Sequence, residues 1–335
     1  MKIKIPASTA NLGPGFDVMG AGLSLYLELT VEKSDITTIS YSGLGTVPLD
    51  PKDNFICQIA VYVANAFNRT LPHYKLHINN PIPLGRGLGS SGSAIIGAIA
   101  MADQLLGLKL SKQEILDYAV IVEGHPDNVA GSLFGSFVTC FVRCPLPKWN
   151  DDWCVAGSKV PTPMSLLQEH NVIGTHLTQV TPLKVNPAIK CVAIIPEFTL
   201  LTSLARSVLP DSYSRQDIIF NMSRLNTLTF AIGAEHVEHQ VIYESMQDKI
   251  HQSYRAHLVP GLSTVLQLNP TTCPGLAGIC LSGAGPTVLV LATDNLNEIG
   301  TTIVEMFKNE KDQNGNAIES RYLILDFDKS GLVIQ

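Results

Sequence analysis

The sequence predicts an α+β fold of two domains, and three observations support this prediction. The chain has 335 residues, which favours two domains at roughly 100–200 residues each. Hydrophobic residues make up 45% and charged residues 16%, so the chain can bury a sizeable core. Strand and helix patterns are mixed in both halves without a strict β-α alternation, which favours α+β over a doubly wound parallel sheet.

The individual elements follow from periodicity and from capping signals. Alternating or β-branched segments mark strands, and apolar residues three or four apart mark helices. The predicted strands are Lys2–Ile5, Leu23–Val31, Tyr74–Ile78, Phe137–Val142, Cys191–Ile195, Ala277–Leu281, Thr287–Leu291 and Arg321–Leu325. The predicted helices are Phe55–Phe67, Ser91–Leu106, Ser111–Val122, Leu201–Val208, Gln216–Ile232, Val237–Met246, Gly261–Leu268 and Leu296–Phe307. Ser111 and Glu114 form a capping box.

The segment Cys144–Pro163 interrupts this order. It contains four prolines and both tryptophans and has no clear period, which is typical of a connection between domains or of a long surface excursion. We therefore predict an N-terminal domain over residues 1–160 and a C-terminal domain over residues 161–335.

Charge and hydropathy exclude several classes of protein. The net charge is 23 − 29 = −6 and there is no basic run, so nucleic acid and anionic membranes are poor partners. The longest apolar stretch, Ala94–Ala102, is about half a bilayer span. Met1–Pro6 alternates like a strand and has no signal-peptide apolar block. We expect a cytoplasmic protein that binds neither nucleic acid nor membrane.

Cysteine and histidine patterns do not indicate a disulfide framework or a metal site. The seven cysteines are odd in number and widely spaced, without a Cys-x-x-Cys pair, which is typical of buried free thiols in a reducing compartment. His236 and His239 could ligate a metal from one helix face. Because Glu235 and Glu238 lie between and beside them, a solvated helix face is the better interpretation.

The segment Pro81–Ala94 carries the strongest functional signal. Gly85, Gly87 and Gly89 alternate with other residues and lead directly into two serines and a helix. Glycine lets backbone amides point inward, and a helix start adds free N–H groups and a partial positive charge. Together they can cradle a phosphate, with serine hydroxyls reaching a phosphate oxygen or a phosphate-bound Mg²⁺. The alternative is a glycine loop that only lets two elements pack.

Two common phosphate loops fit this segment poorly. A Walker loop requires Lys directly before the Ser or Thr, and Gly89 occupies that position. Gly87–Gly92 matches the pattern G-x-G-x-x-G, but Pro81 and Pro83 interrupt the strand that the dinucleotide fingerprint requires. A nicotinamide-dependent dehydrogenase is therefore disfavoured.

Two turn segments each have a structural and a functional interpretation. Pro6–Asp17 carries Asn11 and Asp17, which ordinary turn chemistry also explains. Ser282–Thr287 is a tight glycine turn that reads as a hairpin, and it could also bring backbone close to a ligand.

The segment Glu123–Asn128 places four polar side chains at a helix end. Glu123 follows an apolar run, so its carboxylate is expected to be buried and to need a partner such as a metal ion. The structural interpretation is that Gly124 caps one helix and Asp127 caps the next.

These segments together resemble the GHMP family of small-molecule kinases, and within it the homoserine kinases of the fungal type. Six motifs occur in the expected order between Lys2 and about Leu291. In chain order they are Pro6–Asp17, Pro83–Ser91, Glu123–Ala130, Thr202–Pro210, His251–Arg255 and Ser282–Thr287.

The resemblance implies a fold and a reaction. The fold would combine an N-terminal domain similar to ribosomal protein S5 domain 2, with a left-handed β-α-β crossover, and a ferredoxin-like C-terminal domain. The active site would lie between them. The reaction would transfer a phosphoryl group from ATP to the hydroxyl of L-homoserine in threonine biosynthesis, and the enzyme would be a homodimer.

The resemblance also assigns roles by position. The predicted ATP-binding residues are Pro83, Leu84, Gly85, Arg86, Gly87, Leu88, Gly89, Ser90, Ser91 and Asn128. Mg²⁺ would be held by Ser90 or Ser91 together with Glu123. The predicted homoserine-binding residues are Asn11, Asp17, His125, Asp127, Thr202, Arg206 and Arg255. The predicted catalytic residues are Asn11, Asp17, Glu123, Arg206 and Arg255.

The homoserine roles follow ordinary side-chain chemistry. The two arginines match positions for the carboxylate, Asp17 and Asp127 match positions for the ammonium, and Asn11 would orient the hydroxyl. No lysine lies near these motifs, so our hypothesis is that no dedicated strong base acts. The alternatives are a kinase for another small alcohol and a sensor that has lost catalysis. The arginine pair disfavours the first, and the retained metal-ligand positions disfavour the second.

Overall fold

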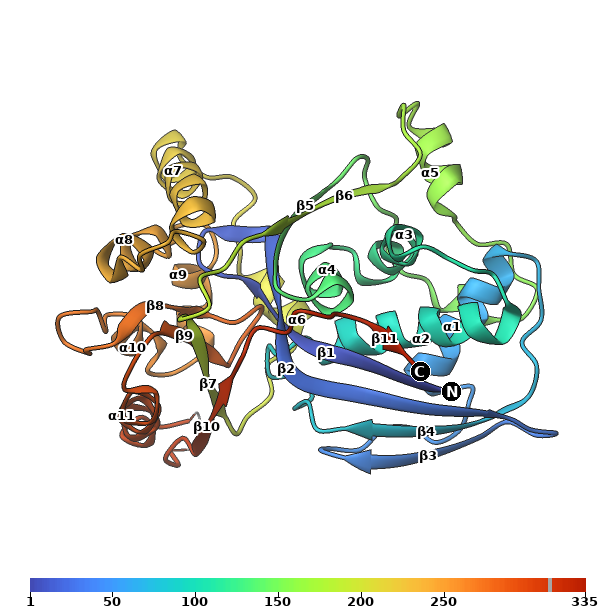
Figure 1. Ribbon diagram of the computed structural model, residues 1–335, viewed down its shortest axis with the longest axis horizontal. Coiled ribbons are helices and arrows are strands. Elements are labelled where there is room, and N and C mark those ends of the chain that lie inside the picture. The colour runs from blue at the N-terminus through green and yellow to red at the C-terminus, as the bar shows by residue number, and fades with distance from the viewer. Residues whose placement is uncertain (313–314) are drawn as a thin grey trace.

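Long strands near the N-terminus build the larger of two sheets in the computed structural model, which describes residues 1–312 and 315–335 (Figure 1). The strands are β1 (Lys2–Asn11), β2 (Gly15–Lys33), β3 (Thr38–Gly43), β4 (Tyr74–Asn80), β5 (Phe137–Val142), β6 (Thr178–Leu183) and β11 (Val333–Ile334). The order is β11-β1-β2-β4-β3, and β5 pairs with both β2 and β6. β3 and β4 are parallel, with a helix between them in the chain.

Four helices belong to this sheet. They are α1 (Phe55–Ala66), α2 (Ser90–Leu106), α3 (Lys112–Glu123) and α4 (Asp127–Phe134). The small residues of α2 let it pack closely on the sheet: a Cβ at Gly97 would lie 2.9 Å from Leu29 and 3.1 Å from Ile5. α3 begins with the predicted capping box at Ser111. The hydrogen bond from Ser8 N to the Leu88 carbonyl attaches the loop before α2 to β1.

The second sheet has the order β10-β7-β9-β8 (Figure 1). Its strands are β7 (Lys190–Pro196), β8 (Leu276–Leu281), β9 (Val288–Ala292) and β10 (Ser320–Leu325). Around it lie α6 (Thr202–Ser207), α7 (Arg215–Ala231), α8 (His239–Ser245), α9 (Gln252–Arg255), α10 (Leu262–Val265) and α11 (Leu296–Lys308). Every residue of β8 and β9 is buried, and this agrees with their continuous apolar sequence.

The predicted α+β class is confirmed, but several predicted bounds are wrong. β1 continues to Asn11 instead of ending at Ile5, and the predicted turn-rich stretch shortens to Leu12–Pro14. Pro6 is accommodated in the strand because the β1–β2 register shifts between Pro6 and Ala7, and proline in sheets favours such bulges. α10 is shorter than predicted.

The segment Cys144–Pro163 is a surface excursion of the larger sheet's half of the molecule. It contains a short 3-10 helix (Asp151–Cys154) and leads into α5 (Pro163–Glu169). The rings of Trp149 and Trp153 lie 5.5 Å and 6.1 Å from the ring of Tyr62 in α1. β6 then pairs with β5, and β11 returns to β1. The division of the chain at residues 160/161 stays a prediction, although strands on both sides of it share this sheet.

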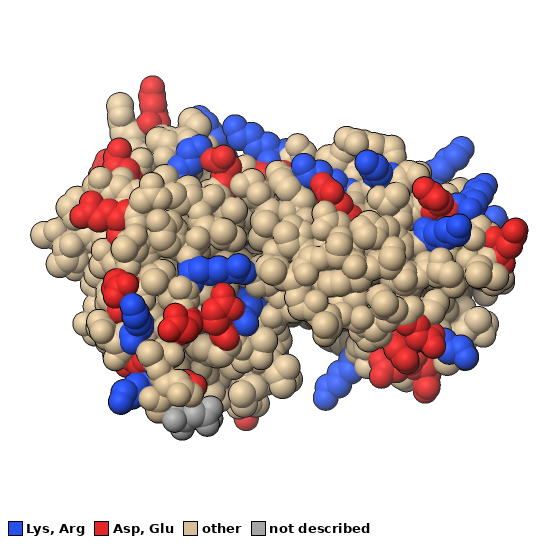
Figure 2. Space-filling model, turned by 90° about the horizontal axis from the view of Figure 1, so that it is seen from below, with Lys and Arg blue, Asp and Glu red and all other residues tan. Residues whose placement is uncertain are grey.

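The remaining global features concern thiols, charge and membrane spans. All seven cysteines are free and six are buried. His236 is exposed and His239 bonds Thr293. Basic and acidic side chains are interspersed on the face in Figure 2. Within the described ranges, no helix has the length and apolarity that a bilayer crossing requires.

Candidate active site

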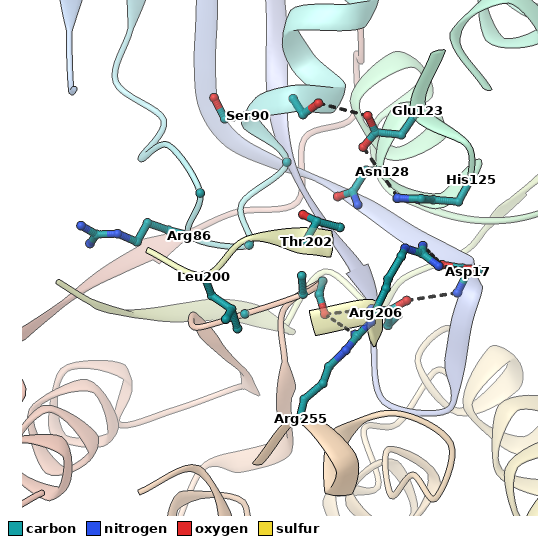
Figure 3. A pocket seen from close by; sticks show the side chains of 18 of the residues that line it. Asp17, Arg86, Ser90, Glu123, His125, Asn128, Leu200, Thr202, Arg206 and Arg255 are labelled. Carbon is teal, nitrogen blue, oxygen red and sulfur yellow. Dashed lines mark hydrogen bonds and ion pairs between the residues drawn. The ribbon is translucent and has the colours of Figure 1, made fainter. Parts of the chain in front are cut away.

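A pocket forms where the N-terminus of α2, the turn after β1 and the α3–α4 connection meet elements of the second sheet (Figure 3). Most of the predicted residues line it: Asn11, Asp17, Gly85, Arg86, Gly87, Gly89, Ser90, Ser91, Glu123, His125, Asn128, Thr202, Arg206 and Arg255. Pro83 and Leu88 are buried outside the lining. Asp127 is buried behind His125.

The glycine loop has the geometry of an anion cradle. Gly85, Gly87 and Gly89 all have positive φ, at 63°, 77° and 67°, which glycine tolerates best. A Cβ at Gly89 would meet Ser8 Oγ at 1.9 Å, and one at Gly87 would meet the Ser282 carbonyl at 2.3 Å. Within the described part of the chain, the backbone amides of residues 85–91 donate no hydrogen bond. They remain available to an anion.

Neighbouring segments hold the loop by its carbonyl oxygens. The Leu88 carbonyl accepts from Ser8 N at 3.1 Å, and the Gly87 carbonyl accepts from Ser282 Oγ at 2.6 Å. The Gly85 carbonyl accepts from Leu200 N at 3.1 Å. The segments Pro6–Asp17 and Ser282–Thr287 therefore hold the glycine loop between them.

Arg86 points away from the cradle (Figure 3). Its Nη1 donates to the Pro196 carbonyl at 2.7 Å and to Glu197 Oε2 at 2.9 Å. These bonds attach the loop to the end of β7. Its contact with ATP stays a prediction.

The two serines differ in their surroundings. α2 begins at Ser90, one residue earlier than predicted. Ser91 Oγ donates to Glu123 Oε2 at 3.1 Å, whereas Ser90 Oγ accepts from Asn80 Nδ2 at 3.4 Å. The Glu123 side chain is 12% exposed, and burial raises the pKa of its carboxyl above the ordinary range. Ser91 and Glu123 thus form an oxygen pair at the helix N-terminus.

His125 and Asp127 form a buried ion pair. His125 Nδ1 lies 2.6 Å from Asp127 Oδ1. Burial alone would favour neutral imidazole, but the Asp127 carboxylate outweighs it and raises the pKa of His125 to about 9. The imidazole is therefore a cation at neutral pH. The helix cap predicted at Asp127 is wrong by one residue, because Pro126 occupies the cap and Asp127 opens α4.

Asp17 and Arg206 pair with each other across the pocket. Two parallel bonds join them, from Nη1 to Oδ2 at 3.0 Å and from Nη2 to Oδ1 at 2.6 Å. The family resemblance assigned these residues to opposite ends of the substrate. The structure places these two side chains in direct contact, and their contact with a substrate stays a prediction.

Arg255 is 2% exposed, and backbone groups hold most of its guanidinium. Nε donates to the Ala205 carbonyl at 2.9 Å, and Nη1 donates to the Gly283 carbonyl at 3.1 Å. Nη2 has no hydrogen-bond partner among the described residues, and Arg255 lines the pocket. One edge of a buried cation therefore faces the pocket.

Asn11 joins two of the motif segments. Its Nδ2 donates to the Gly283 carbonyl at 2.9 Å, and its Oδ1 accepts from Asp17 N at 3.1 Å. Both ends of the amide thus hold loops in place. Contact of this amide with a substrate hydroxyl stays a prediction.

Sequence reasoning missed Phe16 and an apolar pocket beside the glycine loop. The Phe16 ring lies 5.5 Å from the Arg206 guanidinium and 5.2 Å from that of Arg255. Its place directly before Asp17 was the available signal. The apolar pocket shares Gly85, Ser90 and Ser91 with the loop. Its other walls include Leu27, Tyr41, Val47, Pro48, Ile78 and Leu84.

Comparisons with known proteins show which family the chain resembles. Residues 54–136 match the family described as GHMP kinases N terminal domain. The chain is 43% identical to a homoserine kinase of Candida albicans, covering 98% of this chain and 96% of that protein. It is also 43% identical to a homoserine kinase of Saccharomyces cerevisiae, with 91% and 92% covered.

Solved structures show the same fold. A homoserine kinase from Cytophaga hutchinsonii matches with a TM-score of 0.75 at 23% identity, covering 100% of this chain and 97% of that one. A mevalonate kinase from L. major matches with a TM-score of 0.60 at 14% identity, covering 98% and 97%. Given the identity to the curated relatives over nearly the whole length, the chain belongs to the homoserine kinase family of GHMP kinases.

Proposed function

We propose that this protein transfers the γ-phosphoryl group of ATP to the side-chain hydroxyl of L-homoserine. Membership of a kinase family implies the use of ATP. The observation that supports the substrate best is the juxtaposition of a phosphate cradle with Asp17, Arg206 and Arg255 in one pocket. That cluster has groups of both signs, as recognition of an amino-acid zwitterion requires.

ATP would lie along the glycine loop. Its phosphates would accept from the free amides of residues 85–91, next to the positive end of α2. The apolar pocket that begins at the same loop would take the adenine base, because such pockets suit planar, weakly polar rings.

The Ser91–Glu123 pair suits a magnesium ion. Both supply oxygen ligands, and Mg²⁺ in kinases uses one or two protein ligands together with phosphate oxygens. A buried carboxylate with a raised pKa would be ionised more readily beside a cation. When bound, the ion would neutralise charge on the transferring phosphate.

Binding of homoserine would exchange partners within the cluster. Its ammonium would replace the guanidinium at Asp17, and its carboxylate would replace the carboxylate at Arg206. Arg255 would contribute its free Nη2 edge to the same carboxylate. The ion pair thus keeps both recognition groups in place before substrate arrives.

No strong base is required in this scheme. Within the described residues, no lysine lines the pocket. His125 is already protonated at neutral pH and cannot accept a proton. Alignment and charge neutralisation would carry most of the rate. If Asp17→Asn and Asp127→Asn each abolished turnover while homoserine affinity stayed intact, a carboxylate base would have to be assigned.

The test is a coupled ADP-release assay with Mg-ATP and parallel acceptors: L-homoserine, L-serine, L-threonine, mevalonate and galactose. Phosphorus NMR would identify the phosphate ester. We expect turnover with homoserine and a large rise in the homoserine KM for Arg206→Ala. Activity with another acceptor alone would overturn the substrate. ATP binding without any turnover would indicate a sensor.

Two further parts of the proposal concern the cellular setting and the oligomeric state. We expect the enzyme to act in the cytoplasm as part of threonine biosynthesis, and to be a homodimer. Light scattering after size-exclusion chromatography would measure the mass of the assembly against the 36.2 kDa chain.

A further inference from the structure

His251 is buried beside the candidate site. It is fully buried at the start of α9. Its Nε2 lies 2.8 Å from the Gly13 carbonyl and its Nδ1 lies 3.2 Å from Arg255 Nη1. One imidazole thus connects the turn between β1 and β2 with the buried arginine.

These partners determine the tautomer. A carbonyl oxygen only accepts, so Nε2 must carry the proton. A guanidinium only donates, so Nδ1 must offer its lone pair. Protonation at Nδ1 would place two donors and two positive charges 3.2 Å apart.

The charged surroundings of His251 agree with a neutral ring. Asp248 Oδ2 lies 3.7 Å from Nε2, and the Asp17 carboxylate lies further off; both favour a cation. Burial and Arg255 oppose them, and the pKa of His251 is lowered. Cys280 from β8 interacts with the Gly13 backbone but is uncharged at neutral pH, because burial raises its pKa to about 12.

The backbone and the ring of His251 are each held by a neighbouring side chain. Asp248 Oδ2 accepts from the backbone amides of His251 and Gln252 at 2.9 Å and 2.7 Å. The Phe16 ring stacks on the imidazole, with centroids 5.4 Å apart. Phe16 is also the ring that both pocket arginines contact. The imidazole therefore has one orientation in which it can serve both partners.

We propose that neutral His251 is a positioning residue that fixes Arg255 relative to the turn that leads into β2 and Asp17, and that this separation selects substrates with a carboxylate beside the ammonium group. The inference rests on the proposed function for its substrate. The turn is packed closely against the end of α8, because a Cβ at Gly13 would lie 2.2 Å from the Met246 carbonyl. This packing supports the turn as a reference from which Arg255 is placed.

The first test is steady-state kinetics of His251→Phe, which keeps the ring stack and loses both hydrogen bonds. We expect the homoserine KM to rise at least about tenfold, because a hydrogen bond to a charged group is lost. The KM for ATP should change little. The inhibition constant of 3-amino-1-propanol, which lacks the carboxylate, should also change little. An equal rise in both KM values and in the inhibition constant, or an unchanged homoserine KM, would overturn the proposal.

Two conservative variants separate the two bonds. His251→Asn places an amide oxygen near the position of Nδ1 and should restore part of the homoserine affinity that His251→Phe loses. His251→Gln places its amide near Nε2 and should not. Equal affinities for these two variants would contradict the role assigned to Nδ1. The control is His239→Phe, because His239 has a hydrogen bond to Thr293 Oγ1 at 2.9 Å outside the pocket.

A second measurement needs no variant. Nitrogen-15 NMR of labelled histidine should show His251 as the Nε2–H tautomer at pH 7. A charged ring or the Nδ1–H tautomer would overturn the proposal even if every variant failed to fold. If the wild-type protein showed no homoserine-dependent turnover but had this tautomer, the substrate assignment would fail and the Arg255 placement would stand.

Discussion

Glu123 is a largely buried carboxyl whose raised pKa favours a positive partner. Its hydrogen bond from Ser91 distinguishes that serine from Ser90, which bonds Asn80 instead. The sequence alone left the two serines equivalent. In the structure the two serines have different partners, so variants of Ser90 and Ser91 are expected to differ in their magnesium dependence.

We predict that Glu123→Gln lowers kcat on the order of 100-fold and that Ser91→Ala raises the Mg²⁺ concentration required for half-maximal rate more than Ser90→Ala does. The measurement is kcat over a series of Mg²⁺ concentrations at saturating ATP and homoserine. Identical magnesium curves for the two serine variants would contradict the assignment of Ser91.

His125 links stability to pH. Its pKa is 6.5 in the unfolded chain and about 9 in the fold. Because the folded state holds the proton more tightly, its stabilisation is complete below pH 6.5 and is lost as pH rises to about 9. This contribution of His125 to the free energy of unfolding is at most about 3 kcal/mol.

The variant that tests this linkage is His125→Gln, which can still donate to Asp127. We predict that Tm of the wild-type protein falls more steeply between pH 6.5 and 9 than Tm of the variant. The comparison cancels groups common to both proteins. Parallel melting curves across this range would show that the ion pair with Asp127 does not perturb His125.

At the scale of elements, two separate requirements select glycine in the loop: a positive φ and, at some positions, the lack of space for a Cβ. Gly85 and Gly89 share a positive φ, so alanine at either costs about 1–2 kcal/mol of backbone strain. They differ in space: the nearest atom to a new Cβ is 3.5 Å away at Gly85 but 1.9 Å away at Gly89. Of these two glycines, steric exclusion therefore acts only at Gly89.

We predict that Gly89→Ala weakens ATP binding and stability more than Gly85→Ala does. Urea unfolding and ATP titration calorimetry would measure both effects. The Gly85 variant is the matched control for strain without a clash. Equal losses would mean that conformation alone, and not contact with Ser8, explains the glycine.

The sequence predicts these local features well because their causes are local. The capping box at Ser111, the αL cap at Gly124 and the hairpin between β8 and β9 depend on residues a few positions apart. The Asp17–Arg206 pair joins residues 189 positions apart, and no local pattern encodes it. The pairing of β11 with β1 was also outside the reach of local patterns, because a strand of two residues shows too little alternation to be predicted.

The direction in which individual side chains point is the second feature that the sequence could not predict. Arg86 lies in the loop motif, yet its guanidinium bonds to Pro196 and Glu197 at the end of β7. Phe16 stood beside a predicted site residue without a predicted role. Both depend on what the second sheet places against the loop, which only the assembled fold determines.

At the scale of the molecule, the chain leaves the larger sheet after β6 and returns to it at β11 (Figure 1). Hydrogen bonds also tie the two halves at the site: Gly283 N donates to the Ala10 carbonyl at 3.1 Å, and Thr9 Oγ1 lies 2.8 Å from Ser282 Oγ. The chain passes twice between the halves, and hydrogen bonds join them at the site. We therefore expect the halves to unfold together.

The two tryptophans allow this expectation to be tested. Both lie in the excursion over α1, so their fluorescence reports the half with the larger sheet, whereas far-UV circular dichroism reports the whole chain. Ile303 in α11 is fully buried in the core of the second sheet. Ile303→Ala should cost about 2–5 kcal/mol and shift both thermal transitions equally. Ile95→Ala, in the core of the larger sheet, is the matched control. If the fluorescence transition stayed in place while circular dichroism shifted, the halves would be independent units, and closure of the site would require their docking.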